Sequence, residues 1–598
     1  MATARVSRGD STRDTRRRRR IVWIVVAAVL AVVVTALAWL AFRVLQAKDE
    51  LEAAVAASDQ LTAAAGDADF DGARDAVSAL SRHSAAAASV ATDPVWRGAE
   101  LLPWLGPNLS AVRTAADQTH SIASDVAAPL LDLAERLADG TKPAGALLDI
   151  AVLAESRKTL AAAEEVVDEA LDELVDIDTR ALLPPVADGV KRLTSAVKSA
   201  RPLVAAAADA GAVLPAMLGA DGPRTILVML QNNAELRTGG GITGTFIALE
   251  ADQGVLTVSK QADSSDFRPR STPIVPIPAS TEKLYGSVVG RFVQDTSLTP
   301  DFPLTAQLAS AWWEQYAGSA PDAVVSIDPI VLRAVLEVSG PIPTPAGELD
   351  ADNMVDMLLV EPYFRLDQKQ QTAMFTKVVR SVFTALTGGD LDTFRLAEAL
   401  AAPIAQGRVS AWSAHPDEQS VLATTALAGP AARQQAAGRH AYAVYLNDTT
   451  GGKMDTFLDV DFSTGVGACR EDHRRTVEVT VTLTNTAPTD AGRRFPPLMT
   501  GGGNFGIPAG HIGTTVAVSA PARAFIGGVA VDGELAGQVD AEDAGFPVSA
   551  YSVDLAPGET TTLAFRFIAP DTTDITPTVL HTPLIVEPSI GTHTVDCG

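Results

Sequence analysis

The sequence is poor in the residues that most often carry enzyme chemistry. Its 598 residues include only two cysteines and eight histidines, and aromatic residues make up 5% of the chain. It contains no His-Glu-x-x-His, no Gly-x-Ser-x-Gly and no Cys-x-x-Cys, so zincin, serine-hydrolase and redox-motif functions lack support. Only His440 lies in a distinctive neighbourhood, and a structural or exposed role is expected for each histidine.

Positive charge is scarce outside the N-terminus. The net charge is −25, but residues 1–20 hold eight arginines against two aspartates, which leaves −31 for the rest of the chain. Such an acidic body argues against nucleic acid as a partner. With 47% hydrophobic and 20% charged residues the chain suits a folded protein, and its length predicts several domains.

Residues 21–42 form one uncharged apolar run that is long enough to cross a bilayer. Five arginines precede it directly, whereas only Arg43 and Lys48 follow closely. The positive-inside rule makes residues 1–20 a basic cytoplasmic tail and places the chain after the anchor outside. A cleaved signal peptide is the alternative, but its apolar core is normally shorter and ends at a small-residue cleavage site. We expect a single-pass cell-membrane protein whose bulk is extracytoplasmic.

The two cysteines, Cys469 and Cys597, both lie in the C-terminal part of the chain, which this topology places outside the cell. Disulfides form in such oxidising compartments, so a disulfide that closes the last domain is predicted. Two buried free thiols are the alternative.

Changes of pattern divide the chain after the anchor into three domains. Residues 43–215 are alanine-rich with helical periodicity and proline-containing breaks, as at Asp93-Pro94, which predicts a bundle of antiparallel helices. Residues 221–455 alternate strand and helix patterns, typical of an α/β or α+β domain. Residues 456–598 contain strictly alternating runs separated by glycine and proline, which predicts a β-sandwich-like domain. The expected fold is multidomain: transmembrane helix, juxtamembrane α-helical bundle, central α/β domain and C-terminal β-sandwich.

The most distinctive stretch is RTILVMLQNNAELRTGGGITGTFIALE, residues 224–250. An apolar, β-branched run predicts a buried strand, and a second strand follows a glycine cluster. Glycine permits positive φ and close approach of a backbone or a ligand, so the turn between the strands is either a ligand site or an elaborate β-turn. Its polar residues, the candidates for ligand binding, are Asn232, Asn233, Glu235 and Arg237.

Further loops of the central domain carry polar groups. Residues 263–280 form a long proline-punctuated loop, and loops of this length are usually functional or disordered. Asp301 and the pair Asp328-Pro329 have the signature of helix starts. Residues 447–453 predict an Asx turn that ends in a lysine, which could bind glycan or a partner protein, or link two domains. The glycine-rich residues 501–506 are expected to form a long turn rather than a site.

The charged residues of the central domain suit an anionic substrate. Arginines on loops can clamp phosphates, and Mg²⁺ prefers a few carboxylates plus phosphate oxygens. Together they would suffice for phosphoryl transfer, in which positioning and charge neutralisation dominate. The alternative is that these groups form ordinary ion pairs with one another. The arginine candidates are Arg237, Arg268, Arg270, Arg291 and Arg365, and the candidate Mg²⁺ ligands are Asp263, Asp266, Asp295 and Asp301.

Four segments together resemble a known family. They are RTILVMLQNNAELRTGGGITGTF, QDTSLTPDFPLTA, PDAVVSIDPIVLRAVLEVSGPI and YLNDTTGGKMDTFLD, which begin at residues 224, 294, 321 and 445. They are similar to domain of unknown function 4012, a family of membrane-anchored bacterial surface proteins frequent in actinobacteria. The family usually has proline within ELRPTGGF, whereas Thr238 follows Arg237 directly here. The resemblance implies an extracytoplasmic location and no particular reaction.

A fainter likeness links the succession of helix, PDAVVSID, helix, VSGPI and glutamine-rich helix to the LytR–CpsA–Psr family. Those single-pass enzymes transfer glycan phosphates from a polyprenyl-pyrophosphate carrier to peptidoglycan, using arginines on the pyrophosphate and aspartates on a divalent metal. The likeness makes Arg365 a candidate for such an arginine, and Asp295 or Asp301 a candidate metal ligand. The chain lacks that family's dense set of arginines and its arginine–aspartate pair.

Two functions remain as hypotheses. The first is a membrane-anchored extracytoplasmic protein of the bacterial cell envelope with a binding or assembly role. The second is a LytR–CpsA–Psr-like phosphotransferase that moves glycopolymer from a polyprenyl-pyrophosphate lipid to the cell wall with Mg²⁺. Only the second requires Arg237, Arg291 and Arg365 to converge with carboxylates around one pocket.

Overall fold

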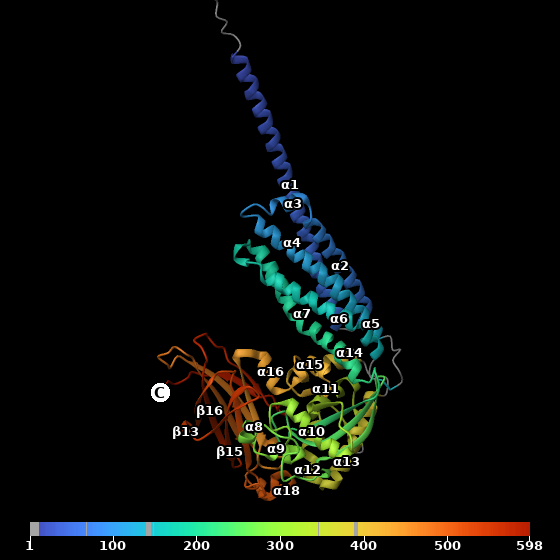
Figure 1. The fold of residues 1–598 in the computed structure, drawn as a ribbon, viewed down its shortest axis with the longest axis vertical. Coiled ribbons are helices and arrows are strands. Elements are labelled where there is room, and N and C mark those ends of the chain that lie inside the picture. Colours follow the sequence, from blue (N-terminus) through green and yellow to red (C-terminus); the bar gives the residue numbers. More distant parts are fainter. Residues whose placement is uncertain are drawn as a thin grey trace, which may run out of the picture. The chain divides into compact units, whose positions relative to one another are not determined.

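A computed structural model of the chain describes residues 11–66, 69–138, 145–146, 149–344, 346–387 and 393–597. The chain divides into two compact units (Figure 1). Unit 1 comprises Met1–Asp139 and Glu155–Ala208, and unit 2 comprises Gly140–Ala154 and Asp209–Gly598.

Unit 1 begins with one continuous helix, α1 (Ser11–Gly66). The part from Arg17 onward includes a window of mean hydropathy 3.0, long and apolar enough to cross a membrane. The helix does not stop where the apolar run ends. Residues 43–65 contain no glycine or proline and are rich in alanine, which has the highest helix propensity. An N-terminal apolar helix of membrane-spanning length, as the sequence predicted, therefore continues directly into the helical region.

Small side chains hold the rest of unit 1 together. Ala54 and Ala57 of α1 pack with Leu80 and Ala123 in one cluster, because alanine lets helix backbones approach closely. The predicted break at Asp93-Pro94 is present, since Asp93 Oδ1 accepts a hydrogen bond from Val95 N at 2.8 Å. The further helices are α2 (Phe70–Ala91), α3 (Pro94–Ala99), α4 (Gly106–Ser121), the π-helical η1 (Ile122–Ala127), α5 (Ala128–Ala138), α6 (Ile150–Val175) and α7 (Pro184–Met217).

A five-stranded sheet in the order β3-β2-β1-β4-β7 forms the centre of the α/β region of unit 2. Strands β1 and β4 are parallel, and all other neighbours are antiparallel. The apolar run of the distinctive stretch is strand β1, as predicted. The strands are β1 (Arg224–Asn232), β2 (Ile242–Asp252), β3 (Val255–Asp263), β4 (Ala323–Ile327) and β7 (Val409–Ser413).

Both faces of this sheet are covered. Leu227 and Met229 of β1 pack with Trp312 and Trp313 of α10 (Phe302–Ala317). The alternate residues Ile226 and Val228 face the other way, toward the end of α7 and α13 (Gln368–Thr387). This period-two division is what a strand buried on both faces requires.

Two of the helices begin at aspartates that the sequence marked as helix starts. Asp301 Oδ1 accepts from Leu304 N at 3.1 Å and caps α10. Asp328 Oδ1 accepts from Ile330 N at 3.0 Å and from Val331 N at 3.2 Å, and caps α11 (Pro329–Ser339). The remaining α-helices of this region are α8 (Ala279–Tyr285), α9 (Val288–Arg291), α12 (Glu361–Arg365), α14 (Thr393–Ala405), α15 (Pro416–Leu422) and α16 (Pro430–Ala437), with a π-helical turn η5 (Asp356–Val360) and a β5–β6 hairpin (Ile342–Thr344, Gly347–Leu349).

Two further sheets contain the C-terminal strands. Their orders are β13-β12-β16-β10-β9-β18 and β14-β15-β11-β8-β17. The two runs predicted as alternating strands are β10 and β16, and they pair antiparallel with each other. The strands are β8 (Ala441–Asp448), β9 (Leu458–Gly467), β10 (Thr476–Asn485), β11 (Ile512–Ser519), β12 (Phe525–Val531), β13 (Glu534–Ala536), β14 (Val539–Asp543), β15 (Phe546–Leu555), β16 (Thr560–Ile568), β17 (Thr578–His581) and β18 (Ser589–Thr592).

One apolar core lies between these two sheets. It joins Val444 and Val516 of one sheet to Val479 and Phe565 of the other. Facing sheets with a shared core are compatible with the predicted β-sandwich. Strand β8, which precedes residue 456, pairs with β11 and β17 and so contributes to this core.

The predicted disulfide is present. Cys469 and Cys597 are bonded across a sequence separation of 128 residues. The bond joins the segment after β9 to the C-terminal end of the chain.

Candidate functional site

The turn between β1 and β2 folds tightly onto itself. A Cβ added at Gly241 would lie 2.2 Å from the carbonyl carbon and oxygen of Asn232. Gly240 has a φ of +131°, a conformation that side chains rarely adopt. Gln231 Oε1 accepts a hydrogen bond from Gly241 N at 3.2 Å. Gly241 is therefore required by close approach within the chain itself, and Gly240 by its backbone conformation.

Arg237 is buried in this turn rather than presented to solvent. Its Nη2 lies 2.9 Å from Asp295 Oδ1 and 3.2 Å from Glu235 Oε1. Its Nη1 donates to the carbonyl of Leu236 at 2.9 Å and to that of Asp448 at 3.3 Å. The side chain is 7% exposed. Burial opposes its charge, but Asp295, Glu235 and Asp448 outweigh that effect and raise the pKa of Arg237.

The loop after β8 completes this buried charge cluster. Lys453 Nζ pairs with Glu235 Oε2. Burial alone would raise the pKa of Glu235, but Lys453 and Arg237 hold it below its ordinary value. Burial and the neighbouring charge of Glu235 raise the pKa of Asp448 to about 6. Burial, with Asp448 nearby, likewise raises the pKa of Asp455 well above its ordinary value.

Hydrogen bonds that involve backbone groups join the same two segments, the turn after β1 and the loop after β8. Asp455 Oδ2 accepts from Leu236 N at 2.7 Å, and Asp448 N donates to Leu236 O at 2.9 Å. Asn447 Oδ1 accepts from Thr238 N at 2.9 Å. The predicted Asx turn is also present, because the carboxylate of Asp448 accepts from the backbone N–H groups two and three residues later. The turn after β1 is thus fastened to the loop after β8.

A second buried cluster lies beside the first. Asn233 Nδ2 donates to Asp328 Oδ2 at 3.0 Å, to Gly240 O at 3.1 Å and to Pro583 O at 3.1 Å. Arg408 Nη1 donates to Asp328 Oδ2 at 2.7 Å, and both side chains are almost fully buried. Burial raises the pKa of Asp328 despite this ion pair. Sequence reasoning missed Arg408, because it stands alone before β7 and carries no local pattern.

The other predicted arginines lie apart from the buried clusters. Arg365 is 70% exposed and pairs with Glu361, four residues earlier, at 3.1 Å. Arg291 Nε donates to the carbonyl of Arg270 at 3.0 Å, and Arg270 Nη1 donates to Gln315 Oε1 at 3.0 Å. Arg268 is exposed. Within the described ranges, Arg291 and Arg365 share no hydrogen-bond or ion-pair partner with Arg237, so the three are not gathered around one set of carboxylates.

The aspartates proposed as Mg²⁺ ligands are divided among structural roles. Asp295 is the ion-pair partner of Arg237, and Asp301 caps α10. Asp263 and Asp266 form a capping box around a short 3₁₀ turn. In the part of the chain that the structure describes, no group of three or more histidine, cysteine or carboxylate side chains is arranged to hold a metal ion.

A large apolar pocket of about 680 Å³ lies on the face of the central sheet opposite α10. Its volume is within the range of small-molecule sites. The sheet supplies Val228, Leu230 and Ile247, and α11 supplies Val335. Helix α13 contributes the longest stretch of wall, with Phe375, Val378, Val379, Val382, Phe383 and Leu386.

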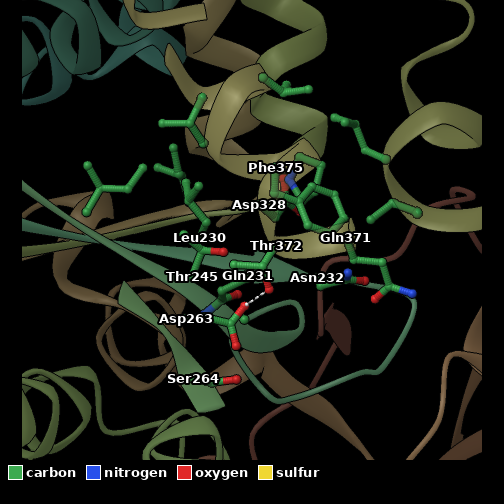
Figure 2. Close-up of a pocket in the computed structure, with 18 of the residues that line it drawn as sticks. Leu230, Gln231, Asn232, Thr245, Asp263, Ser264, Asp328, Gln371, Thr372 and Phe375 are labelled. Carbon is green, nitrogen blue, oxygen red and sulfur yellow. Dashed lines mark hydrogen bonds between the residues drawn. The ribbon is translucent and has the colours of Figure 1, made fainter. Parts of the chain in front are cut away.

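Polar groups occupy one part of the lining (Figure 2). Thr372 Oγ1 of α13 donates to Asp263 Oδ2 at the end of β3, at 3.1 Å. Asn232 Nδ2 donates to the hydroxyl of Tyr363 at 2.5 Å. Lys453 also reaches the lining, and among the residues that the structure describes it is the only basic one there. Gly501, Asn504 and Phe505 of the glycine-rich loop line the pocket too, so that loop is more than a connecting turn.

The pocket overlaps little with the predicted site residues. Asn232 lines it, and so does Asp263, whereas Arg237, Arg291 and Arg365 do not. The apolar wall was missed because leucines, valines and phenylalanines at helical spacing in residues 368–387 are indistinguishable from core residues in a sequence. One signal was available in the sequence: polar residues follow the apolar strands, and such residues can lie beside an apolar face.

Comparison with known proteins agrees with the motifs. Residues 221–363 match the family model described as protein of unknown function, DUF4012. This range contains the turn after β1, α10 and α11, and three of the four segments that carried the resemblance. The likeness to the LytR–CpsA–Psr family finds no such match. No curated protein and no solved structure matches the chain. The stretch from residue 221 to residue 363 is therefore similar to the DUF4012 family, and this match covers less than half of the chain.

Proposed function

We propose that this protein is a single-pass membrane protein of the bacterial cell envelope whose extracytoplasmic unit 2 binds the hydrocarbon part of an amphiphile. The observation that carries the proposal is the pocket between the central sheet, α11 and α13. Its walls are formed by aliphatic and phenylalanine side chains, and most of its polar groups lie in one part of the lining. A molecule with an apolar chain and a polar end matches that division.

The energetics favour a chain over a compact polar ligand. Each methylene transferred from water to an apolar site contributes about 0.8 kcal/mol. A phosphate-rich head group would need free cations, but Lys453, the only basic side chain among the described residues of the lining, is paired with Glu235. The polar end of the ligand would therefore meet mainly amide and hydroxyl groups, such as Asn232 and Thr372.

Two features support the extracytoplasmic location of unit 2. The basic tail before the apolar part of α1 favours a cytoplasmic N-terminus under the positive-inside rule. The Cys469–Cys597 disulfide suits an oxidising compartment. An amphiphile supplied by the envelope would be available to a protein with that topology.

The geometry gives the phosphotransferase hypothesis no comparable support. That reaction needs arginines and carboxylates around one pocket. Here Arg237 is ion-paired with Asp295 in a buried cluster, and Arg365 is exposed beside Glu361. Mg²⁺-dependent binding of a polyprenyl-pyrophosphate lipid would support the phosphotransferase hypothesis.

The test is photocrosslinking of the full chain, reconstituted in phospholipid vesicles, with palmitic acid that carries a diazirine. We expect crosslinks to residues of α13 and α11 in addition to those in the apolar part of α1. Val379→Trp fills the pocket and should abolish the crosslinks in α13 and α11. Val258→Trp, at an exposed position of β3 outside the pocket lining, is the matched control and should keep them. Crosslinks confined to α1 in the unmodified protein would overturn the proposal.

A further inference from the structure

The connection between α3 and α4 in unit 1 exposes large apolar side chains that no packing inside the unit explains. Leu101 is 86% exposed, Trp104 is 75% exposed, and Leu102 is 43% exposed. Three such residues within four positions form a local apolar patch, and patches of this kind mark interaction surfaces. The three residues are called the α3–α4 patch below.

The patch is tied to the end of the apolar run of α1. Asp93, the N-cap of α3, accepts a hydrogen bond from Trp39 Nε1 at 3.1 Å and lies 3.4 Å from Arg43 Nε. Leu40 is buried against Trp96 of α3 and Leu109 of α4. Helix α3 and the first part of α4 therefore pack on the last turn of the apolar run.

A second connection reaches the same end of unit 1. Leu183 N, just before α7, donates to Asn108 Oδ1 in the first turn of α4 at 2.7 Å. The Leu183 side chain is itself exposed. Figure 1 shows α3 beside α1 at the end of the helical region from which the first half of α1 projects.

The position of the patch along α1 defines its surroundings. An α-helix rises about 1.5 Å per residue, so Leu40 and Arg43 are separated by about 5 Å along the axis. Arg43 is the first charged residue after the apolar run. If α1 crosses the bilayer, residues 39–43 lie at the boundary between hydrocarbon and head groups. Tryptophan is enriched at that boundary, because its ring is apolar and its N–H can meet water or head groups.

We propose that the α3–α4 patch, with Leu183 beside it, inserts into the interfacial region of the same leaflet through which α1 emerges. Unit 1 would then contact the bilayer at a second place, which fixes its height on the membrane. The contact is apolar and does not depend on anionic lipid, because the nearby charges neutralise one another: Glu100 pairs with Arg97 at 3.3 Å and with Arg113 at 2.9 Å, and Asp117 lies 3.4 Å from Arg113. The inference rests on the proposed transmembrane course of α1.

The experiment measures the depth of nitroxide labels in the full chain, reconstituted in phosphatidylcholine vesicles. The two native cysteines are bonded to each other, so a single introduced cysteine is the only free thiol. Trp104→Cys probes the patch and Val33→Cys probes the apolar run. Asp59→Cys is the control: it is exposed on α1, sixteen residues beyond Arg43, or about 24 Å further along the helix. Each label is tested for collision with oxygen, which concentrates in lipid, and with a water-soluble nickel complex.

We expect the labels at 33 and 104 to favour oxygen by at least several-fold relative to the label at 59, and addition of phosphatidylglycerol to leave that ratio unchanged. A label at 104 that is as accessible to nickel as the one at 59, while 33 remains in lipid, would overturn the inference and leave the transmembrane course intact. A label at 33 that is accessible to nickel would refute the transmembrane course itself. Spin–spin broadening at 104, with protection from both reagents, would show that a second copy covers the patch instead of lipid.

Discussion

Arg237 and Asp295 form an ion pair of 2.9 Å inside the protein, where the two side chains are 7% and 17% exposed. Their sequence separation is 58 residues, and the pair holds the turn after β1 against the segment after α9. A charge buried in this way is costly to leave without its partner.

Replacement of Arg237 by alanine should therefore destabilise unit 2 rather than impair binding in a folded protein. Removing one partner of a buried pair typically costs about 3–5 kcal/mol, since Asp295 would lose its ion-pair partner and Glu235 would keep only Lys453. The measurement is the free energy of unfolding from tryptophan fluorescence in urea. Arg365→Ala is the matched control and should change it by less than about 0.5 kcal/mol, because that arginine is on the surface. Equal effects of the two substitutions would contradict the structure.

Two glycines of the same hairpin should differ sharply in their tolerance of alanine. A Cβ at Gly241 would meet the carbonyl group of Asn232 at 2.2 Å, whereas nothing lies within 4 Å of a Cβ at Gly244. We expect Gly241→Ala to lower the unfolding free energy by about 1–3 kcal/mol or more, as overpacking does. Gly244→Ala should leave the thermal midpoint of unfolding almost unchanged. A loss of stability at Gly244 comparable to that at Gly241 would show that both glycines serve the strand rather than the turn.

Binding in the pocket should depend on the length of the apolar chain. Each added methylene contributes about 0.8 kcal/mol, or roughly fourfold in affinity, until the 680 Å³ cavity is full. Competition by fatty alcohols of increasing length against the diazirine probe measures this dependence. The affinity should rise and then level off. An affinity that is independent of chain length would indicate that the ligand binds through its polar end alone.

Loss of the disulfide should weaken unit 2. The Cys469–Cys597 bond closes a long segment of chain, and native disulfides typically contribute about 2–4 kcal/mol by restricting the unfolded state. The double variant with serine at both positions should unfold at lower urea concentration than the wild type. Dithiothreitol should shift the wild type toward the variant and leave the variant itself unaffected; a variant as stable as the oxidised wild type would refute the prediction.

The buried cluster should also make stability fall as pH rises from about 4 to 6. Burial raises the pKa of Asp448 to about 6 from an ordinary value of 3.8. Between those values the folded protein holds a proton that the unfolded chain releases, so this contribution is full below the unfolded pKa and is lost as pH rises through the folded one. The loss is on the order of 1–3 kcal/mol. The raised pKa values of Asp455 and Asp328 act in the same direction, whereas the lowered pKa of Glu235 acts in the opposite one.

Urea unfolding at pH 4.5 and pH 7 tests this dependence. Asp448→Asn should reduce the difference between the two pH values, because the amide cannot ionise. Asp472→Asn is the control: Arg470 holds the pKa of that exposed aspartate at about 2, below the range tested. The same pH dependence in the wild type and in Asp448→Asn would remove Asp448 as its source.

Features that depend on neighbours a few residues apart could be predicted from the sequence alone. The apolar run of α1, the caps at Asp301 and Asp328, and the alternation of β10 and β16 all arise from local periodicity or from hydrogen bonds within one turn of chain. The long motif around the turn after β1 was specific enough to indicate the DUF4012 family.

Which charges meet, and where space remains, depends on the packing of segments that are far apart in the sequence. The sequence was compatible with Arg237 as a phosphate ligand, whereas the fold places Asp295 and Glu235 beside it. Nothing in the sequence distinguished Arg408, which the fold pairs with Asp328. The pocket is a region that apolar side chains from β1, α11 and α13 line without filling. Apolar periodicity shows that a face is buried, but not whether the faces it meets close on one another, because that depends on how distant elements pack.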